Sequence, residues 1–310
     1  MDIPITLIVS SRPGPSLRRH SELFTSTLIA PRDAILRIDA TPLVIPGRFA
    51  VSEPDTYYRT PGCDCCASRE DLIASIVRTA QRAEPPEHLM VLVDPNSEDV
   101  ATVVATVLSS FEINRRCFLD SVVLHVDAVE SATRLATGDS IVSVAVESAL
   151  AIADRIVLDD LHQVTDATLH EIRAELRARA GFVQRIDGDG AERLDAWHGA
   201  PIAVERRPSP DDSPSTVLLR VESPLDADAI EGWLDLLVAR HAARLLRLQG
   251  ALSVEGHEDR TCCFGVRSFT FSHSENEHRL HRSTESVLAI CGIGLDPDEL
   301  TASFRLTVAS

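Results

Sequence analysis

Short apolar runs alternate with helical stripes over the first two thirds of this 310-residue chain, and this alternation limits the folds open to it. Four runs have the length and composition of buried strands: residues 5–9, 89–93, 122–126 and 155–158. Between them, residues 68–83 form a helical stripe that Ser68 can cap, and Leu169, Ile172 and Leu176 mark another. Strands joined through helices pair in parallel, so the pattern predicts an α/β fold with a parallel sheet covered on both faces.

Residues 199–215 interrupt this pattern and separate two predicted domains. Four prolines fall in this segment beside Asp211 and Asp212, as in an exposed linker: Pro201, Pro208, Pro210 and Pro214. Beyond it, the sequence predicts strands at residues 216–221, 245–254, 263–271 and 287–291, and helices at 226–240 and 297–304. We therefore expect a first domain over residues 1–200, a linker over 201–215, and a smaller α+β domain over 216–310.

The net charge of −17 disfavours one class of partner. Nucleic acid phosphates are bound by clustered Lys and Arg, so we expect no direct binding of DNA, whereas docking on a basic protein is compatible with this charge. No apolar run approaches the ~20 residues of a membrane span. The chain opens directly into a strand-like run, without the basic start or cleavage site of a signal peptide. These features predict a cytoplasmic protein with no membrane partner.

Three of the seven cysteines form a tight cluster that suits a metal ion: Cys63, Cys65 and Cys66. Pro61 and Gly62 directly before them supply the turn chemistry that such closely spaced ligands need. Thiolates suit Zn²⁺ or Cu⁺, and we favour zinc. Three thiolates leave the fourth position of a tetrahedral zinc open, which fits sensing or transfer better than a permanent structural site. The alternative is three free, partly buried thiols.

A second group of candidate ligands lies near the end of the chain: Cys262, Cys263, His273, His278 and His281. The i, i+3 spacing of the last two histidines would place them on one face of a helix. We expect a solvated polar loop with surface histidines here in preference to a second metal site. Cys117 and Cys291 stand beside apolar residues and are expected to be buried as small hydrophobes.

Several segments, in the same order, resemble the CobW-type P-loop GTPases, a family of cytoplasmic metal chaperones and metal-insertion proteins. Residues 62–66, followed by Arg69, Asp71 and Leu72, resemble the family's GCxCC segment and the helix after it. Further similar segments are residues 122–129, 153–158, 233–234, 247–250 and 293–296. The resemblance implies a P-loop-NTPase-like parallel sheet followed by a CobW C-terminal-like α+β domain. It also implies an acidic residue near the cysteines, for which Asp39 and Asp64 are candidates.

The nucleotide motifs of that family are altered. A P-loop needs backbone N–H groups, a lysine and a Mg²⁺-binding hydroxyl, but this chain contains no lysine, and Ser16 and Leu17 stand at the last two positions. Pro13 and Pro15 remove two N–H donors. Residues 93–96 lack the glycine expected to sense the γ-phosphate, and Asp159 with Asp160, expected in a solvated loop, replaces the amide and lysine that read guanine. We expect a pseudo-GTPase with no catalytic or nucleotide-binding residues.

An intact thiol motif beside altered nucleotide loops predicts a zinc-responsive protein adaptor. The chain resembles, in architecture and thiol motif, the actinobacterial factors that recruit a ribosome hibernation factor during zinc starvation, which implies a hibernation factor or ribosomal protein as partner. One alternative is a zinc metallochaperone that delivers metal to a client metalloenzyme. A second is a residual GTPase, which would bind nucleotide without the P-loop lysine.

Overall fold

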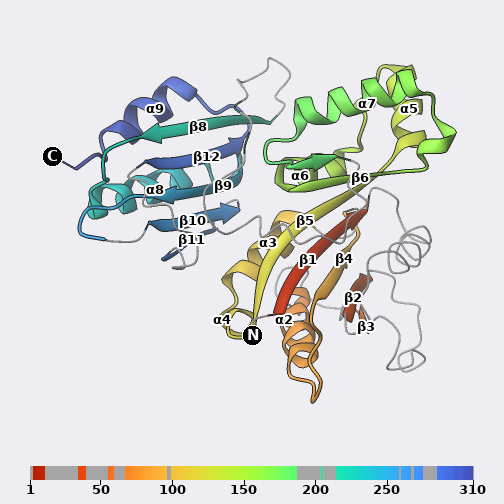
Figure 1. Cartoon of the computed structure of the whole chain (residues 1–310), viewed down its shortest axis with the longest axis horizontal. Coiled ribbons are helices and arrows are strands. Elements are labelled where there is room, and N and C mark those ends of the chain that lie inside the picture. The colour runs from red at the N-terminus through yellow and green to blue at the C-terminus, as the bar shows by residue number, and fades with distance from the viewer. Residues whose placement is uncertain are drawn as a thin grey trace. The chain divides into compact units, whose positions relative to one another are not determined.

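The computed structural model describes residues 3–10, 34–39, 55–58, 67–95, 99–186, 203, 205, 214–257, 260–266, 269–274 and 285–309. The chain forms two compact units, each with its own sheet (Figure 1). The first unit comprises Met1–Ala149, Ala153–Leu176 and Arg185–Asp195. The second unit comprises Leu150–Ile152, Arg177–Gln184 and Ala196–Ser310.

The first unit contains a seven-stranded sheet in the order β3-β2-β4-β1-β5-β6-β7, in which every neighbouring pair is parallel. Its strands are β1 (Ile3–Ser10), β2 (Ala34–Asp39), β3 (Asp55–Tyr58), β4 (Leu89–Val93), β5 (Cys117–Asp127), β6 (Arg155–Asp159) and β7 (Arg185–Ile186). Every residue of β1 and β4 is buried. Burial on both faces explains why these strands are continuous apolar runs in the sequence. The parallel pairing of all neighbouring strands confirms the predicted parallel sheet.

Helices connect these strands in sequence. They are α2 (Ala67–Ala80), α3 (Val100–Ser109), α4 (Phe111–Asn114), α5 (Ala128–Thr137), α6 (Val144–Ile152), the 3₁₀ turn η1 (Leu161–Gln163) and α7 (Asp166–Arg179). Leu72, Ile76 and Ala80 form the predicted buried face of α2. The predicted cap was wrong, because α2 already begins at Ala67 and Ser68 lies inside the helix.

The second unit is built on a five-stranded antiparallel sheet in the order β11-β10-β9-β12-β8. Its elements are β8 (Ser215–Val221), α8 (Ala227–His241), β9 (Leu245–Leu252), β10 (Thr261–Val266), β11 (Phe269–Ser274), β12 (Ser286–Gly292) and α9 (Pro297–Arg305). Residues 263–271, predicted as one strand, instead belong to a hairpin in which Val266 pairs with Phe269. The polar residues Arg267 and Ser268 separate its two strands.

The main core of the second unit lies between α8, α9 and one face of the sheet. Ile230, Trp233 and Leu237 of α8 pack with Leu300 and Phe304 of α9 in this cluster. The Trp233 and Phe304 rings lie 5.2 Å apart between centroids. The indole Nε1 of Trp233 donates to the hydroxyl of Ser303 at 3.0 Å, so this large buried side chain also satisfies its polar atom.

A buried arginine lies on the opposite face of the same sheet. Arg247 on β9 is 1% exposed, and its guanidinium donates to the carbonyl oxygen of Ile152 and to Oε1 of Gln249, each at 2.6 Å. The guanidinium carbon lies 4.1 Å from the centroid of the Phe182 ring. Phe182 and Cys291 belong to one buried cluster on this face. Ile152 and Phe182 precede the proline-rich segment, so the second unit draws residues from both sides of it.

The structure confirms the burial predicted for Cys117 and Cys291, which are 2% and 1% exposed. It also shows that no helix in the described part of the chain has both the length and the apolarity needed to cross a bilayer.

Candidate functional site

The predicted zinc-binding cysteines lie between two described elements. Cys63, Asp64, Cys65 and Cys66 themselves lie outside the described residues, in the segment that links the end of β3 at Tyr58 to the start of α2 at Ala67. Asp39 is the last residue of β2, and its Cα pairs with that of Tyr58. The backbone of Asp39 therefore lies at the sheet edge from which the cysteine segment departs.

The cysteine segment leads directly into a helix. Since α2 begins at Ala67, Cys66 directly precedes a 14-residue helix. The partial positive charge at a helix N-terminus stabilises a nearby thiolate, which is the form that binds a metal. The sequence motif and the start of α2 thus support the same zinc chemistry.

The second group of candidate ligands does not form a metal site among the residues that are described. His278 and His281 lie outside them, and only the backbone is described for Cys262 and His273, which are paired across β10 and β11. Cys263 is 3% exposed and packs among apolar side chains in the main core of the second unit. Within the described ranges, no group of three or more His, Cys, Asp or Glu residues could hold a metal ion.

Polar residues gather at the carboxyl ends of neighbouring strands in the first unit. Ser10 ends β1 and its Cα pairs with that of His125 on β5. Asp127 ends β5 and pairs with Asp159, the last residue of β6. Asp94 directly follows β4. Open parallel sheets bind their ligands at this edge, so its chemistry indicates which ligands the first unit can accept.

His125 and Asp159 form a hydrogen-bonded pair at this edge. The Nδ1 atom of His125 lies 3.0 Å from Oδ2 of Asp159, and their side chains are 5% and 21% exposed. Because His125 pairs with Val157, Asp159 lies two residues further along on the same face of the sheet. The solvated loop predicted for Asp159 was wrong: this residue belongs to β6 and holds a buried histidine. The one sequence signal for His125 is an ionisable residue inside an apolar run.

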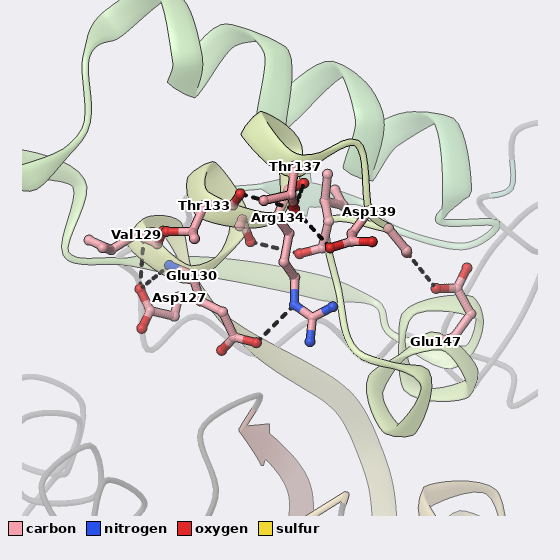
Figure 2. A network of polar contacts seen from close by, with 11 residues as sticks. Asp127, Val129, Glu130, Thr133, Arg134, Thr137, Asp139 and Glu147 are labelled. Atoms are coloured by element: carbon pink, nitrogen blue, oxygen red, sulfur yellow. Dashed lines mark hydrogen bonds and ion pairs between the residues drawn. The ribbon is translucent and has the colours of Figure 1, made fainter.

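Asp127 is engaged at the start of α5. Its Oδ1 atom accepts hydrogen bonds from the backbone N–H groups of Val129 at 2.8 Å and Glu130 at 3.2 Å (Figure 2). The Nε atom of Arg134 lies 3.1 Å from Oε1 of Glu130 on the next turn. Asp127 is therefore an N-cap, which explains why an aspartate follows the apolar run of β5.

Carboxylates lie close together at this edge of the sheet. Asp94, Asp127 and Asp159 all follow or end strands here, and Asp160 comes next with a left-handed backbone, at φ 57°. Among the described residues at the carboxyl ends of β1, β4, β5 and β6, none is an arginine. This part of the edge is therefore acidic.

Two family models match consecutive parts of the chain. The CobW/HypB/UreG nucleotide-binding domain matches residues 50–184, and the cobalamin synthesis protein CobW C-terminal domain matches residues 215–307. The chain is also similar to the zinc chaperone YjiA of Escherichia coli (strain K12). The two are 24% identical over 259 residues, which cover 79% of this chain and 80% of YjiA.

Solved structures share this fold over their whole length. The crystal structure of the Zn(II)-bound YjiA GTPase from E. coli has a TM-score of 0.70 with this chain at 16% identity, and the alignment covers 100% of both chains. A Zn(II)-bound triple mutant of the YjiA GTPase has a TM-score of 0.71 at 16% identity and the same coverage. These matches confirm the predicted fold, which is a P-loop-NTPase-like parallel sheet with helices followed by a smaller α+β domain. The two consecutive domain matches show that the chain combines a CobW/HypB/UreG nucleotide-binding domain with a CobW C-terminal domain.

Proposed function

We propose that this chain is a zinc-handling protein that binds Zn²⁺ through Cys63, Cys65 and Cys66 and works with a protein partner without a GTP switch. The observation that carries the proposal is the thiol motif placed directly before α2, in a chain homologous to a zinc chaperone. A helix N-terminus next to closely spaced thiols favours thiolates and hence zinc. Three thiolates leave one position for Asp39, Asp64, water or a ligand from the partner.

Independence from GTP is supported by the chemistry of the nucleotide loops. The lysine that contacts the β- and γ-phosphates in a P-loop is missing from the whole chain. Asp159, at the position corresponding to the guanine-reading amide, is bonded to His125 instead. A guanine base would meet two carboxylates, Asp159 and Asp160, where the motif supplies an amide and a lysine. If GTP does not switch the protein, bound zinc is the ligand that can control its interaction with the partner.

The first experiment measures zinc and nucleotide together in protein purified under reducing conditions. We expect about one equivalent of zinc and no GTP or ATP. Serine at Cys63, Cys65 and Cys66 should abolish zinc binding. The matched control changes the second group, with Cys262→Ser, His278→Ala and His281→Ala, and should retain zinc. Unchanged zinc content in the first variant, or stoichiometric bound nucleotide in the natural chain, contradicts the proposal.

The bound zinc can serve one of two roles in this proposal. In the first, the protein is a chaperone that hands zinc to a client, as the name of its relative suggests. In the second, zinc loading changes the cysteine loop and the start of α2 and so controls adaptor binding, a form favoured by the altered nucleotide motifs. Zinc transfer to an apo-client in the presence of a competing chelator supports the chaperone. Zinc-dependent retention of ribosomal or hibernation proteins, without transfer, supports the adaptor.

A further inference from the structure

The outer faces of α8 and α9 expose leucines that the fold does not use. Among the described residues, the exposed large hydrophobic side chains are Phe111, Leu236 and Leu306, and the last two lie on α8 and directly after α9. Leu236 is 58% exposed and Leu306 is 83% exposed. The buried stripe of α8, formed by Ile230, Trp233 and Leu237, faces the sheet without Leu236. An amphipathic helix normally carries polar residues at such outward positions.

Leu236 lies on α8 and Leu306 lies directly after α9, and these two neighbouring helices run in opposite directions. Trp233 contacts Ser303, and Arg240 contacts Glu299, so the residue numbers rise along α8 as they fall along α9. Leu236 lies three residues after Trp233, and Leu306 lies three residues after Ser303. With a rise of about 1.5 Å per residue, these leucines are separated by about 10 Å along the helices. We call the exposed residues of α8, α9 and their flanks the α8/α9 outer face.

The α8/α9 outer face is strongly acidic. Exposed carboxylates on these helices and at their N-caps are Asp226, Asp228, Glu231, Asp235, Asp296, Asp298 and Glu299, against the exposed arginines Arg240, Arg244 and Arg305 on the helices and their C-terminal flanks. Three have structural roles: Asp226 and Asp296 cap the helices, and Glu299 pairs with Arg240. Asp228, Glu231, Asp235 and Asp298 have no comparable role in the contacts of the described chain. With the other carboxylates they give the two helices a negative net charge.

We propose that the α8/α9 outer face is the docking surface for the protein partner, and that the partner presents a basic surface with apolar side chains among its Arg and Lys residues. Exposed apolar side chains within a charged rim are typical of protein interfaces. Charge complementarity selects a basic partner over other proteins. This inference rests on the proposed function only in naming a partner of that zinc-handling protein.

The same charges argue against other occupants. Nucleic acid and anionic lipid headgroups both carry negative charge and would be repelled. A second copy of this chain would bring an identical acidic face against this one, which costs free energy unless cations intervene. A basic protein is therefore the occupant that both the leucines and the carboxylates favour.

The test uses a fluorescein-labelled peptide of alternating Arg and Leu residues as a probe, with a second peptide in which Ser replaces Leu. Fluorescence anisotropy at about 0.05 M and 0.15 M salt reports the Kd for the full-length protein. The double variant Leu236→Ser with Leu306→Ser should weaken binding of the Arg–Leu peptide about tenfold and leave that of the Arg–Ser peptide unchanged. The double variant Asp235→Arg with Asp298→Arg should weaken both peptides at least about tenfold and flatten the salt dependence.

A matched control separates a docking surface from general attraction to an acidic protein. Asp166→Arg with Glu171→Arg changes the net charge by the same amount on the exposed face of α7. Control binding should stay within about twofold of the natural chain. Equal weakening in the control, an unchanged Kd in the leucine variant, or dimerisation that the leucine variant abolishes would overturn the proposal. Circular dichroism verifies folding of each variant.

Zinc content measured in the same preparations keeps the two proposals apart. Variants of the α8/α9 outer face should bind as much zinc as the natural chain, since the cysteines lie in another part of the sequence. If the natural chain binds the peptide but is found to contain no zinc, the zinc function is contradicted and the docking surface stands. If the natural chain binds zinc, but the peptide shows no preference for the α8/α9 outer face, the docking surface is contradicted and the zinc function stands.

Discussion

Replacement of Arg247 by methionine tests how far the second unit depends on one buried cation. Methionine keeps an unbranched apolar side chain, so the change removes the guanidinium with limited loss of packing. The carbonyl oxygen of Ile152 and the amide oxygen of Gln249 then lose their donor in the interior, at about 1–2 kcal/mol each. Loss of the contact between the guanidinium and the Phe182 ring adds about 1 kcal/mol.

The burial of the charge itself offsets part of this loss, because removing a guanidinium from water is unfavourable. We therefore expect Arg247→Met to lower the free energy of unfolding of the second unit by about 3 kcal/mol. Urea titration followed by Trp233 fluorescence measures this change, since Trp233 lies in the main core of that unit. The measurement uses a Trp197→Phe background, so that Trp233 is the one fluorescent indole.

Arg240→Met is the matched control, because it removes the same charge from the surface of the same unit. Arg240 and Glu299 are 65% and 56% exposed, and a pair of this kind contributes less than about 1 kcal/mol. Equal losses for the two variants, or a loss below about 1 kcal/mol for Arg247→Met, would refute the reasoning. Either result would mean that the contacts of Arg247 only balance the cost of burying it.

Three further predictions follow from single contacts. Asp127→Ala should destabilise the first unit by about 1 kcal/mol through loss of the α5 cap, measured by thermal unfolding. Gly250→Ala should destabilise the second unit by about 2 kcal/mol or more, since a Cβ there would lie 2.7 Å from the backbone carbonyl oxygen of Val287 in the neighbouring strand; urea titration with Trp233 as the reporter measures it. Asp159→Ala should increase hydrogen exchange at the ends of β5 and β6 by removing the partner of His125, and nucleotide binding should not appear in this variant.

The sequence predicted the elements whose environment is uniform along their length. Residues 89–93 are a strand with identical bounds in the structure, because all five side chains are buried and the run is apolar throughout. The α8 helix was predicted at residues 226–240 and spans Ala227–His241, with Asp226 as its N-cap. Both cases depend on local signals, which are burial and capping.

The features missed by the sequence depend on pairing between distant segments. The β10–β11 hairpin reads as one apolar run, and its reversal is visible only in the register that pairs Val266 with Phe269. The bond between His125 and Asp159 joins residues 34 positions apart on adjacent strands. The cluster around Arg247 joins β9 to Ile152 and Phe182, which belong to a different part of the sequence. No periodicity in a single segment carries such information.

The position of the altered residues explains how the nucleotide motifs can change while the sheet persists. The first-unit strands are stabilised by burial along their whole length, and Ile5, Leu7 and Val9 on β1 are inaccessible to solvent. The residues expected to contact a nucleotide lie at or beyond the carboxyl ends of these strands. Asp159, at the end of β6, is hydrogen-bonded to Nδ1 of the buried His125. The fold thus constrains the strands, whereas the residues at and beyond their carboxyl ends can differ between chains that share this sheet.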